Sequence, residues 1–507
     1  MRYIFTSLTL LCFTCYQVFS QQAYERSYAA PNGITDWAVT YSTLDNTMWY
    51  AVCDGQDLTL HHLNSTGIST ATYSYTGVNA GDVSIVQGVN GLIYLSGRGA
   101  GTGVDYYVLA VNFAGNVQWS KKYTVNTLAH YDHSRIRLLP NGNVMIVESV
   151  YGHLGYIEVD GFTGNVVSSA QFREDTTFEN KTPGFAGDVF GDGSFVFSGK
   201  KGSDIAIVRS DASGNVLWSA VLNSGVAYYH TKGITACSDG STLACGMENY
   251  SGFVMKVDAN GTVQWYNVFD AGLVFYDIVQ IDANTFGVCG TMGSNFVYSR
   301  FDMNGNELST IKFTYPGWTF AAHDLVVGPT GAVAIPFMLS DPSWSVPAAA
   351  GLLLMEPGFS LECGMSPYTL ITSTSSSDPS VLNVPIYRAA EPIGVTNLVV
   401  SANLEQTSVT EDMCVILAVN HVDAVSDLTL QNSPAEQGQA VTFALGTWQG
   451  DVTYVVTDAL GREVMRRGMN YSGGQQPIEG SERLAAGIYV LNVENENGMQ
   501  TQKFVIR

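Results

Sequence analysis

Acidic residues recur along this chain at intervals of about 50 residues, each beside a short apolar run. They are Asp36, Asp82, Asp132, Asp188, Asp277 and Asp324. Histidines and large aromatic residues stand close to several of these positions: His133, His230, His323, Tyr276 and Trp318. If the fold gathers these side chains, the carboxylates could hold a hard cation such as calcium, and the rings could stack on sugar faces.

A structural role competes with this chemistry for the aspartates. An Asp at the start of a strand can accept hydrogen bonds from exposed backbone N–H groups and so lock neighbouring repeats together. That role would explain why the residue recurs, and a repeated residue is more often structural than catalytic. We therefore favour the structural interpretation for the aspartates, whereas the aromatic residues on variable loops remain candidates for ligand contacts.

Glycine turns at nearly constant spacing identify the elements that must position these side chains. They contain Gly67, Gly115, Gly164, Gly214, Gly261 and Gly305, with a weaker copy at Gly358. One repeat, 232–270, divides into four strands with alternating apolar and polar residues and a tight D-A-N-G turn. A repeat of this length suits a four-stranded propeller blade.

We therefore predict an all-β protein whose residues 21–365 form a seven-bladed β-propeller, with six or eight blades as alternatives. The segment 23–28 resembles an outer strand and could complete the last blade, which would close the ring. In a propeller, the connections that carry the recurring aspartates gather on one face, around the mouth of the central channel. The other face should hold only tight turns.

Composition excludes some partners and indicates an exported chain. The net charge of −22 argues against nucleic acid and anionic membrane surfaces, which both require basic patches. Residues 1–20 have the single early charge and short apolar stretch of a secretory signal peptide. No later apolar stretch is long enough to span a bilayer, so we expect no membrane insertion.

The six cysteines that follow the predicted signal peptide show no CxxC pair and hence neither a zinc ribbon nor a redox motif. Cys53, Cys245 and Cys289 share one repeat position with serines of other repeats, which predicts small buried side chains. Cys363 and Cys414 lie outside the regular repeats, and a disulfide could bridge them in an exported chain.

The repeats resemble those of secreted bacterial β-propellers, in which an Asp-x-x-Gly turn precedes an aromatic residue. Asp211 precedes Trp218 in this way, and Asp258 precedes Trp265. This resemblance implies a fold but little about function.

Residues 425–507 resemble the type A C-terminal sorting domain of the type IX secretion system. The matching segments are NSPA before VTFAL, VTDALGREV, and the ending LAAGIYVLNVENENGMQTQKFVIR. The resemblance implies a small C-terminal β-sandwich, recognition by the outer-membrane export machinery, and a secreted or cell-surface destination. Residues 366–424 begin with a Ser/Thr-rich stretch, and we interpret them as a linker followed by an unassigned β segment.

For function, these features predict an exported protein that binds an extracellular polymer, either a glycan or a surface protein, through its loop-rich face. Catalytic motifs such as HExxH and GxSxG are absent from the sequence, so binding is favoured over catalysis. One alternative is a polymer-degrading enzyme that uses channel-face carboxylates such as Asp132 or Asp188. Another is a structural surface component. No cofactor is predicted, and calcium is the metal that the aspartates could bind.

Overall fold

A computed structural model describes residues 23–506, with gaps. The gaps are residues 29–35, 55–56, 79–82, 99–104, 126–134, 151–152, 174–185, 202–203, 224–228, 315–318, 341–348, 356, 358–364, 372–379, 383–386, 391–392, 399, 406–410, 413–427, 432–434, 436, 446–447, 459–461 and 496–497. The chain forms two compact units that divide near residue 409.

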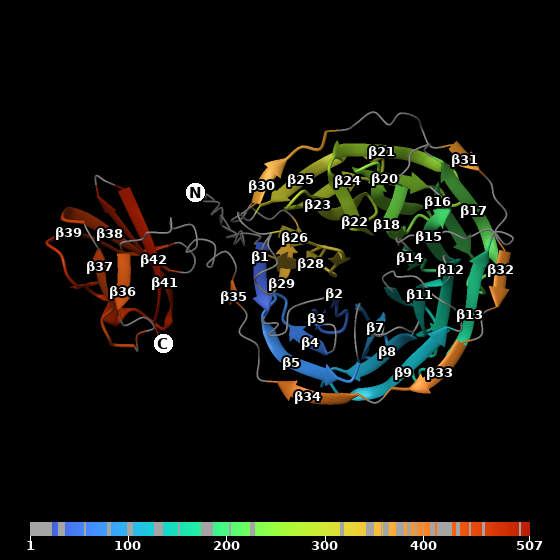
Figure 1. The fold of residues 1–507 in the computed structure, drawn as a ribbon, viewed down its shortest axis with the longest axis horizontal. Helices are drawn as coiled ribbons and strands as arrows, with labels where there is room; N and C mark the ends of the chain where they lie inside the picture. The colour runs from blue at the N-terminus through green and yellow to red at the C-terminus, as the bar shows by residue number, and fades with distance from the viewer. Residues whose placement is uncertain are drawn as a thin grey trace, which may run out of the picture. The chain divides into compact units, whose positions relative to one another are not determined.

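Seven antiparallel sheets form the larger unit and surround a central channel as the blades of a propeller (Figure 1). Blade 1 contains β2 (Asp36–Tyr41), β3 (Met48–Cys53), β4 (Leu58–Leu63) and β5 (Ser69–Thr76). Blade 2 contains β6 (Ser84–Gln87), β7 (Leu92–Arg98), β8 (Asp105–Asn112) and β9 (Val117–Val125). Blade 3 contains β10 (Arg135–Leu138), β11 (Val144–Val150), β12 (His153–Val159) and β13 (Val166–Arg173). Blade 4 contains β14 (Ala186–Val189), β15 (Phe195–Lys201), β16 (Asp204–Ser210) and β17 (Val216–Asn223).

The remaining three blades continue this order, and the last one includes the first strand of the chain. Blade 5 contains β18 (Tyr229–Ala236), β19 (Thr242–Glu248), β20 (Ser251–Val257) and β21 (Val263–Ala271). Blade 6 contains β22 (Leu273–Gln280), β23 (Thr285–Met292), β24 (Asn295–Asp302) and β25 (Glu307–Phe313). Blade 7 contains β26 (Thr319–Ala321), β27 (Val326–Val327), β28 (Val333–Ser340), β29 (Ala349–Met355) and β1 (Ala23–Tyr28). The predicted seven-bladed propeller and its closure by the N-terminal strand are therefore confirmed.

Each predicted glycine turn that the structure describes joins the third strand of a blade to its fourth. At Gly115 the backbone has φ +71°, a conformation that glycine adopts without steric cost. The Gly115 N–H donates to the carbonyl of Asn112, and the Asn112 side chain accepts from the N–H groups of Ala114 and Asn116. Because these hydrogen bonds form between residues close in the sequence, the turns could be predicted from the sequence.

Replacing Gly115 by alanine is expected to lower the free energy of unfolding by about 2–3 kcal/mol. The left-handed backbone disfavours any side chain here, and the added Cβ would also overlap the ring of Tyr73 in blade 1. Gly142→Ala is the matched control, since Gly142 has φ +85° but no neighbour closer than 3.9 Å to a Cβ. Chemical unfolding of both variants should show the smaller loss for Gly142→Ala, about 1 kcal/mol.

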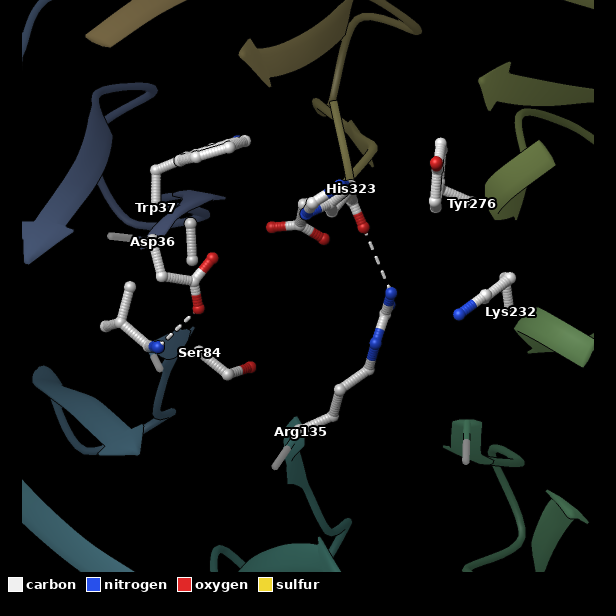
Figure 2. Close-up of a pocket in the computed structure, with 10 residues that line it drawn as sticks. Asp36, Trp37, Ser84, Arg135, Lys232, Tyr276 and His323 are labelled. Carbon is white, nitrogen blue, oxygen red and sulfur yellow. Dashed lines mark hydrogen bonds between the residues drawn. The ribbon is translucent and has the colours of Figure 1, made fainter. Parts of the chain in front are cut away.

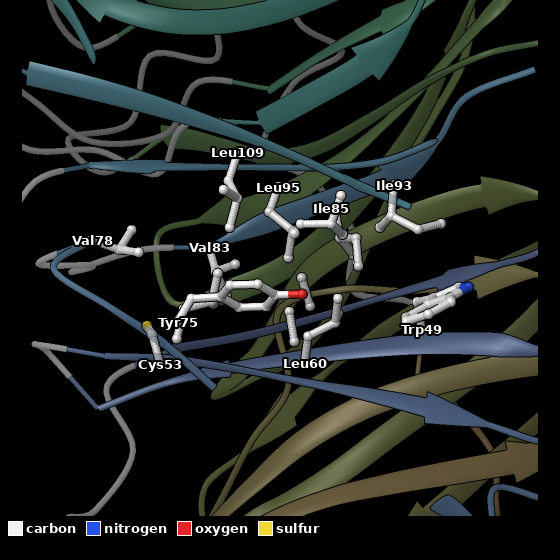
Figure 3. Close-up of a cluster of buried hydrophobic side chains, with 14 of the residues drawn as sticks. Trp49, Cys53, Leu60, Tyr75, Val78, Val83, Ile85, Ile93, Leu95 and Leu109 are labelled. Carbon is white, nitrogen blue, oxygen red and sulfur yellow. The ribbon is translucent and has the colours of Figure 1, made fainter. Parts of the chain in front are cut away.

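Apolar side chains between neighbouring blades form the core of the propeller. Figure 3 shows the cluster between blades 1 and 2, where Trp49, Tyr75 and Leu109 are fully buried. Cys53 lies in this cluster and, like Cys245 and Cys289, is fully buried. The prediction of small buried side chains at this repeat position is confirmed.

A belt of short strands runs around the outside of the ring, in the segment that we interpreted as a linker followed by an unassigned β segment. Its strands are β30 (Met365–Tyr368), β31 (Ser380–Leu382), β32 (Tyr387–Ala390), β33 (Ile393–Asn397), β34 (Ser401–Glu405) and β35 (Glu411–Asp412). They add antiparallel to the outermost strands of blades 6, 4, 3, 2, 1 and 7 respectively, so the belt runs backwards along the order of the blades (Figure 1). These strands agree with the β segment that we expected here, and they extend the propeller beyond residue 365. Most of the Ser/Thr-rich stretch that we interpreted as a linker lies outside the described residues.

The smaller unit is a C-terminal β-sandwich, as predicted. Its first sheet contains β36 (Leu428–Gln431), β37 (Thr442–Leu445) and β40 (Gln476–Pro477). The second contains β38 (Gly450–Asp458), β39 (Glu463–Tyr471), β41 (Gly487–Asn495) and β42 (Gly498–Ile506), and a 3₁₀ turn, η1, spans Ser481–Arg483. Phe443 of the first sheet and Tyr454, Leu491 and Phe504 of the second are buried in one core.

Two sequence predictions concern segments that the structure does not describe. The signal peptide at 1–20 and the proposed Cys363–Cys414 disulfide both lie outside the described residues, and both stay predictions. Within the described residues, no helix has the length and apolarity required to cross a membrane.

Candidate functional site

The first strand of each blade faces the central channel, and its N-terminal end lies on the face where the inter-blade connections gather. Ten residues from these ends line a cavity of about 80 Å³, which we call the mouth cavity (Figure 2). They are Asp36, Trp37, Ala38, Val83, Ser84, Arg135, Lys232, Tyr276, His323 and Asp324. Blades 1, 2, 3, 5, 6 and 7 all contribute, so residues far apart in the sequence form one site.

The four recurring aspartates that the structure describes accept hydrogen bonds from backbone N–H groups of the next blade. Asp36 of blade 1 accepts from Val83 of blade 2 at 2.7 Å. Asp188 accepts from Ala236 at 2.8 Å, which joins blades 4 and 5.

The same contact recurs on the other side of the ring. Asp277 accepts from Leu325 at 3.0 Å, which joins blades 6 and 7. Asp324 accepts from Val39 at 3.3 Å and so joins the last blade to the first. These contacts are the inter-blade locks that the structural interpretation predicted.

Arg135 crosses the channel from blade 3 to the opposite blades. Its Nη1 donates to Asp277 Oδ1 at 3.0 Å and its Nη2 to the backbone carbonyl of His323 at 3.1 Å. Only 13% of the Arg135 side chain and 5% of the Asp277 side chain are exposed, so this ion pair is buried. Arg135 therefore joins opposite sides of the ring where it lines the mouth cavity.

Burial and neighbouring charges perturb both members of this pair. Burial raises the pKa of the Asp277 carboxyl to about 6 even though Arg135 lowers it, and the carboxylate of Asp324 adds to the rise. Burial also lowers the pKa of Arg135, but Asp277 and Asp324 outweigh that effect and raise it above its ordinary value. The pair thus consists of a permanent cation and a carboxyl group whose pKa lies above its ordinary value.

Aromatic rings form one wall of the mouth cavity. The Trp37 ring stacks on His323 with centroids 5.3 Å apart, and the Trp37 Nε1–H donates to the carbonyl of Pro336. The Tyr276 ring lies 4.7 Å from the other side of His323. In Figure 2 the Lys232 side chain points toward the cavity from the side opposite Asp36. Rings and a cation therefore line the same cavity.

A wider cavity of about 490 Å³ is lined by residues further along the inner strands. Its lining includes Asp188, Asp277 and Asp324, with Arg137 donating from Nε to Asp188 Oδ1 at 3.1 Å. Apolar residues such as Val279 and Pro329 complete its wall toward the face of tight turns. Two of the predicted site residues, Asp188 and Asp277, therefore line the channel rather than its mouth.

The structure brings together four of the predicted site residues at the mouth cavity. These are Asp36, Tyr276, His323 and Asp324. His230 is half-buried on β18 and is not among the described residues that line either channel cavity. Four further predicted residues lie outside the described part of the chain: Asp82, Asp132, His133 and Trp318.

The calcium prediction remains a prediction. Within the described ranges, no three His, Cys, Asp or Glu side chains converge as metal ligands. Two of the recurring aspartates, Asp82 and Asp132, fall in the gaps of the description.

Sequence reasoning missed the basic residues of the site. Arg135 and Lys232 stand near the starts of inner strands, each two positions after a histidine, His133 and His230 respectively. A search of these strand starts for any charged residue, rather than for acidic ones alone, would have found both. Trp37 follows Asp36 directly and could have been found in the same way.

Comparison with known proteins identifies the C-terminal unit and yields weak similarities for the whole chain. Residues 433–507 match the family model of the secretion system C-terminal sorting domain. Virginiamycin B lyase from Staphylococcus aureus is similar at 11% identity and a TM-score of 0.46, over 66% of this chain and 99% of that chain.

PorZ, a surface component of the type IX secretion system of Porphyromonas gingivalis, is similar at 11% identity and a TM-score of 0.27, over 95% of this chain and 82% of that chain. No curated protein sequence matches. The assignment of the propeller therefore rests on its sheets, and that of the C-terminal unit on the family match. The chain is a β-propeller protein with a type IX secretion C-terminal sorting domain, which marks it for export to the cell surface or beyond.

Proposed function

We propose that this exported propeller binds an extracellular glycan through its loop-rich face, with the mouth cavity as the floor of the binding site. The observation that supports this proposal is the grouping of Tyr276, His323 and Lys232 in one cavity at the channel mouth. Aromatic faces stack on sugar rings, and a lysine ammonium group can bind the hydroxyl or acidic groups of a polysaccharide.

Binding is favoured over catalysis by how the carboxylates are engaged. Asp188 accepts from Ala236 N–H, Thr235 Oγ1 and Arg137 Nε, and Asp277 accepts from Leu325 N–H and Arg135. A general acid or base must exchange protons with a substrate, so carboxylates held by several protein donors are poorly suited to that task. A surface protein remains the alternative partner, and the experiment below distinguishes it.

Replacing Tyr276 by alanine is expected to weaken glycan binding about fivefold to tenfold, because one stacking ring contributes about 1 kcal/mol. Binding of the secreted protein to a panel of soluble and insoluble polysaccharides would measure this effect. Lys232→Gln should weaken binding to acidic polysaccharides more than to neutral ones.

Phe162→Ala is the matched control, because Phe162 is 71% exposed in a tight turn on the opposite face. It should leave binding unchanged. If no polysaccharide binds but cell-surface proteins are captured with the same dependence on Tyr276, the partner is a protein. Equal binding by Tyr276→Ala and wild type would contradict the use of this cavity.

A further inference from the structure

The face of tight turns contains a separate cavity between blades 6 and 7, which we call the turn-face cavity. Its volume is about 360 Å³. Tyr298 and Arg300 of β24 line it together with Pro329, Met355 and Pro357 of blade 7. It shares Pro329 with the wider channel cavity but no residue with the mouth cavity, so this site is distinct from the glycan site proposed above.

Two hydrogen-bond donors in this cavity lack a partner among the residues that the structure describes. They are the Arg300 Nε–H and the Tyr298 hydroxyl, both shielded from solvent. Tyr298 as a whole is only 2% exposed, and burial raises its pKa, so the hydroxyl keeps its proton. Since alternate residues of a strand face the same side, the two donors belong to one surface of β24. An unpaired buried donor costs about 1–3 kcal/mol, so the pair needs an explanation.

Comparison with other blades shows that Arg300 is the exception at its repeat position. The residue five positions before the turn glycine is His62, Arg209 or Lys256 in blades 1, 4 and 5. Lys256 binds Asp239 at 3.0 Å, Arg209 donates to the carbonyl of Gly240 at 2.7 Å, and His62 Nε2 lies 2.9 Å from Thr47 Oγ1. Each of those side chains contacts a tight turn on the same face. The Nε–H of Arg209, like that of Arg300, has no partner among the described residues, but Arg209 is held through its terminal nitrogens. Arg300 differs in that none of its nitrogens donates a hydrogen bond to a described residue, so its guanidinium is left for another acceptor.

A glycine on the neighbouring strand makes room for the tyrosine. Gly287 pairs with Arg300 across β23 and β24, and a Cβ at Gly287 would lie 3.0 Å from the Tyr298 hydroxyl oxygen. At the equivalent position other blades carry side chains, for example Val196 and Leu243. The absence of a side chain at Gly287 therefore lets the Tyr298 ring occupy this space.

The charge around the cavity favours a singly charged acceptor. Asp282 lies exposed at the rim and already accepts hydrogen bonds from Asn284 N–H and from the N–H and hydroxyl of Thr285. Its carboxylate would repel a doubly charged anion near Arg300 more strongly than a monoanion. The walls supplied by Pro329, Met355 and Pro357 suit an apolar body.

We propose that the turn-face cavity binds a small organic acid, whose carboxylate accepts hydrogen bonds from Arg300 Nε and the Tyr298 hydroxyl while its apolar body contacts Pro329 and Met355. A planar carboxylate matches the side of a guanidinium group, and such charge-assisted hydrogen bonds are among the stronger ones in proteins.

The test uses the full-length secreted protein with benzoate as the probe, benzamide as its neutral isostere, and inorganic phosphate as a different anion. Calorimetric titration and thermal unfolding should show that benzoate binds and raises the melting temperature, whereas benzamide and phosphate do not. Arg300→Gln should weaken benzoate binding at least about tenfold, and Tyr298→Phe about fivefold. Tyr298→Phe should fold as stably as wild type, because its hydroxyl has no partner to lose.

Arg209→Gln is the matched control, since it removes the equivalent arginine of blade 4 and should leave benzoate binding unchanged. Failure of benzoate to bind would overturn the proposal, as would undiminished binding by Arg300→Gln. Equal binding of phosphate or benzamide would overturn the assignment to carboxylates. Glycan binding at the channel mouth and benzoate binding at the turn-face cavity are tested independently, because the two sites lie at different ends of the strands.

Discussion

Replacing Arg135 by methionine is expected to lower the free energy of unfolding of the propeller by about 3–5 kcal/mol at pH 7.5. The substitution leaves the Asp277 carboxylate buried without its cation and beside Asp324. It also removes the hydrogen bond to the His323 carbonyl, which ties blade 3 to blade 7 across the channel. Methionine keeps much of the side-chain volume, so the loss reports on charge rather than on an empty space.

The loss should shrink as the pH falls. In the wild type the pKa of Asp277 is about 6 in the folded state, against an ordinary value of 3.8. Between these values the folded protein binds more protons than the unfolded chain, so the contribution of this carboxyl to stability falls as the pH rises. Without Arg135 the pKa of Asp277 rises further, so the contribution of this carboxyl to stability falls more steeply as the pH rises. The difference in the free energy of unfolding between Arg135→Met and the wild type is therefore expected to be large above pH 7 and small near pH 5.

A second substitution separates charge from packing. Asn at position 277 is neutral and can still accept the hydrogen bond from Leu325. The double variant Arg135→Met/Asp277→Asn should therefore recover most of the stability that Arg135→Met loses at pH 7.5. Urea unfolding of the four proteins of this cycle at pH 5 and pH 7.5 gives the coupling energy. A double variant no more stable than Arg135→Met would show that the buried pair is not the cause.

Features stabilised by contacts between neighbouring residues could be predicted from the sequence. The turn at Gly115 requires a left-handed backbone and the side chain of Asn112, and both are visible within four residues. The alternation in β20 correctly predicted a strand, although both of its faces are buried: Phe253 and Met255 pack in one core and Val254 packs in the next. Because these local patterns recur at a nearly constant interval along the chain, together they predicted a propeller.

Features that depend on distant partners could not be predicted in the same way. Asp324 could be identified as a recurring residue, but the hydrogen bond that it accepts from the Val39 N–H joins positions 285 residues apart. Arg135 has no local motif, since its role arises only when the ring places Asp277 opposite it. The individual belt strands could not be predicted for a related reason. The strands β31 and β32 contain only three and four residues, which is too short for a detectable alternation of apolar and polar residues. Pairing with the outer strands of the blades, rather than local propensity, gives them their structure.

Removing the belt is expected to have a larger effect than any single substitution in the propeller. Each belt strand pairs with two to five residues of an outer strand, and additional bonds such as Lys121 Nζ to Asn397 hold it in place. Without the belt the outer edges of six blades would present unpaired N–H and C=O groups, which promote aggregation. A chain that ends after residue 364 should therefore lose more than about 5 kcal/mol of stability and aggregate, whereas one that ends after residue 412 should not.

The backward course of the belt makes this prediction specific, because progressive truncation from the C-terminal end should uncover the blades in a fixed order. A chain that ends after Leu398 loses β34 and β35 and should therefore lose amide protection in β5 and β1. The same chain keeps β33, so β9 of blade 2 should remain protected. Hydrogen–deuterium exchange on chains ending at residues 398 and 412 measures both strands in one experiment. Uniform loss of protection around the ring would instead mean that the belt stabilises the propeller as one cooperative unit, and unchanged protection of β5 would mean that blade 1 does not need it.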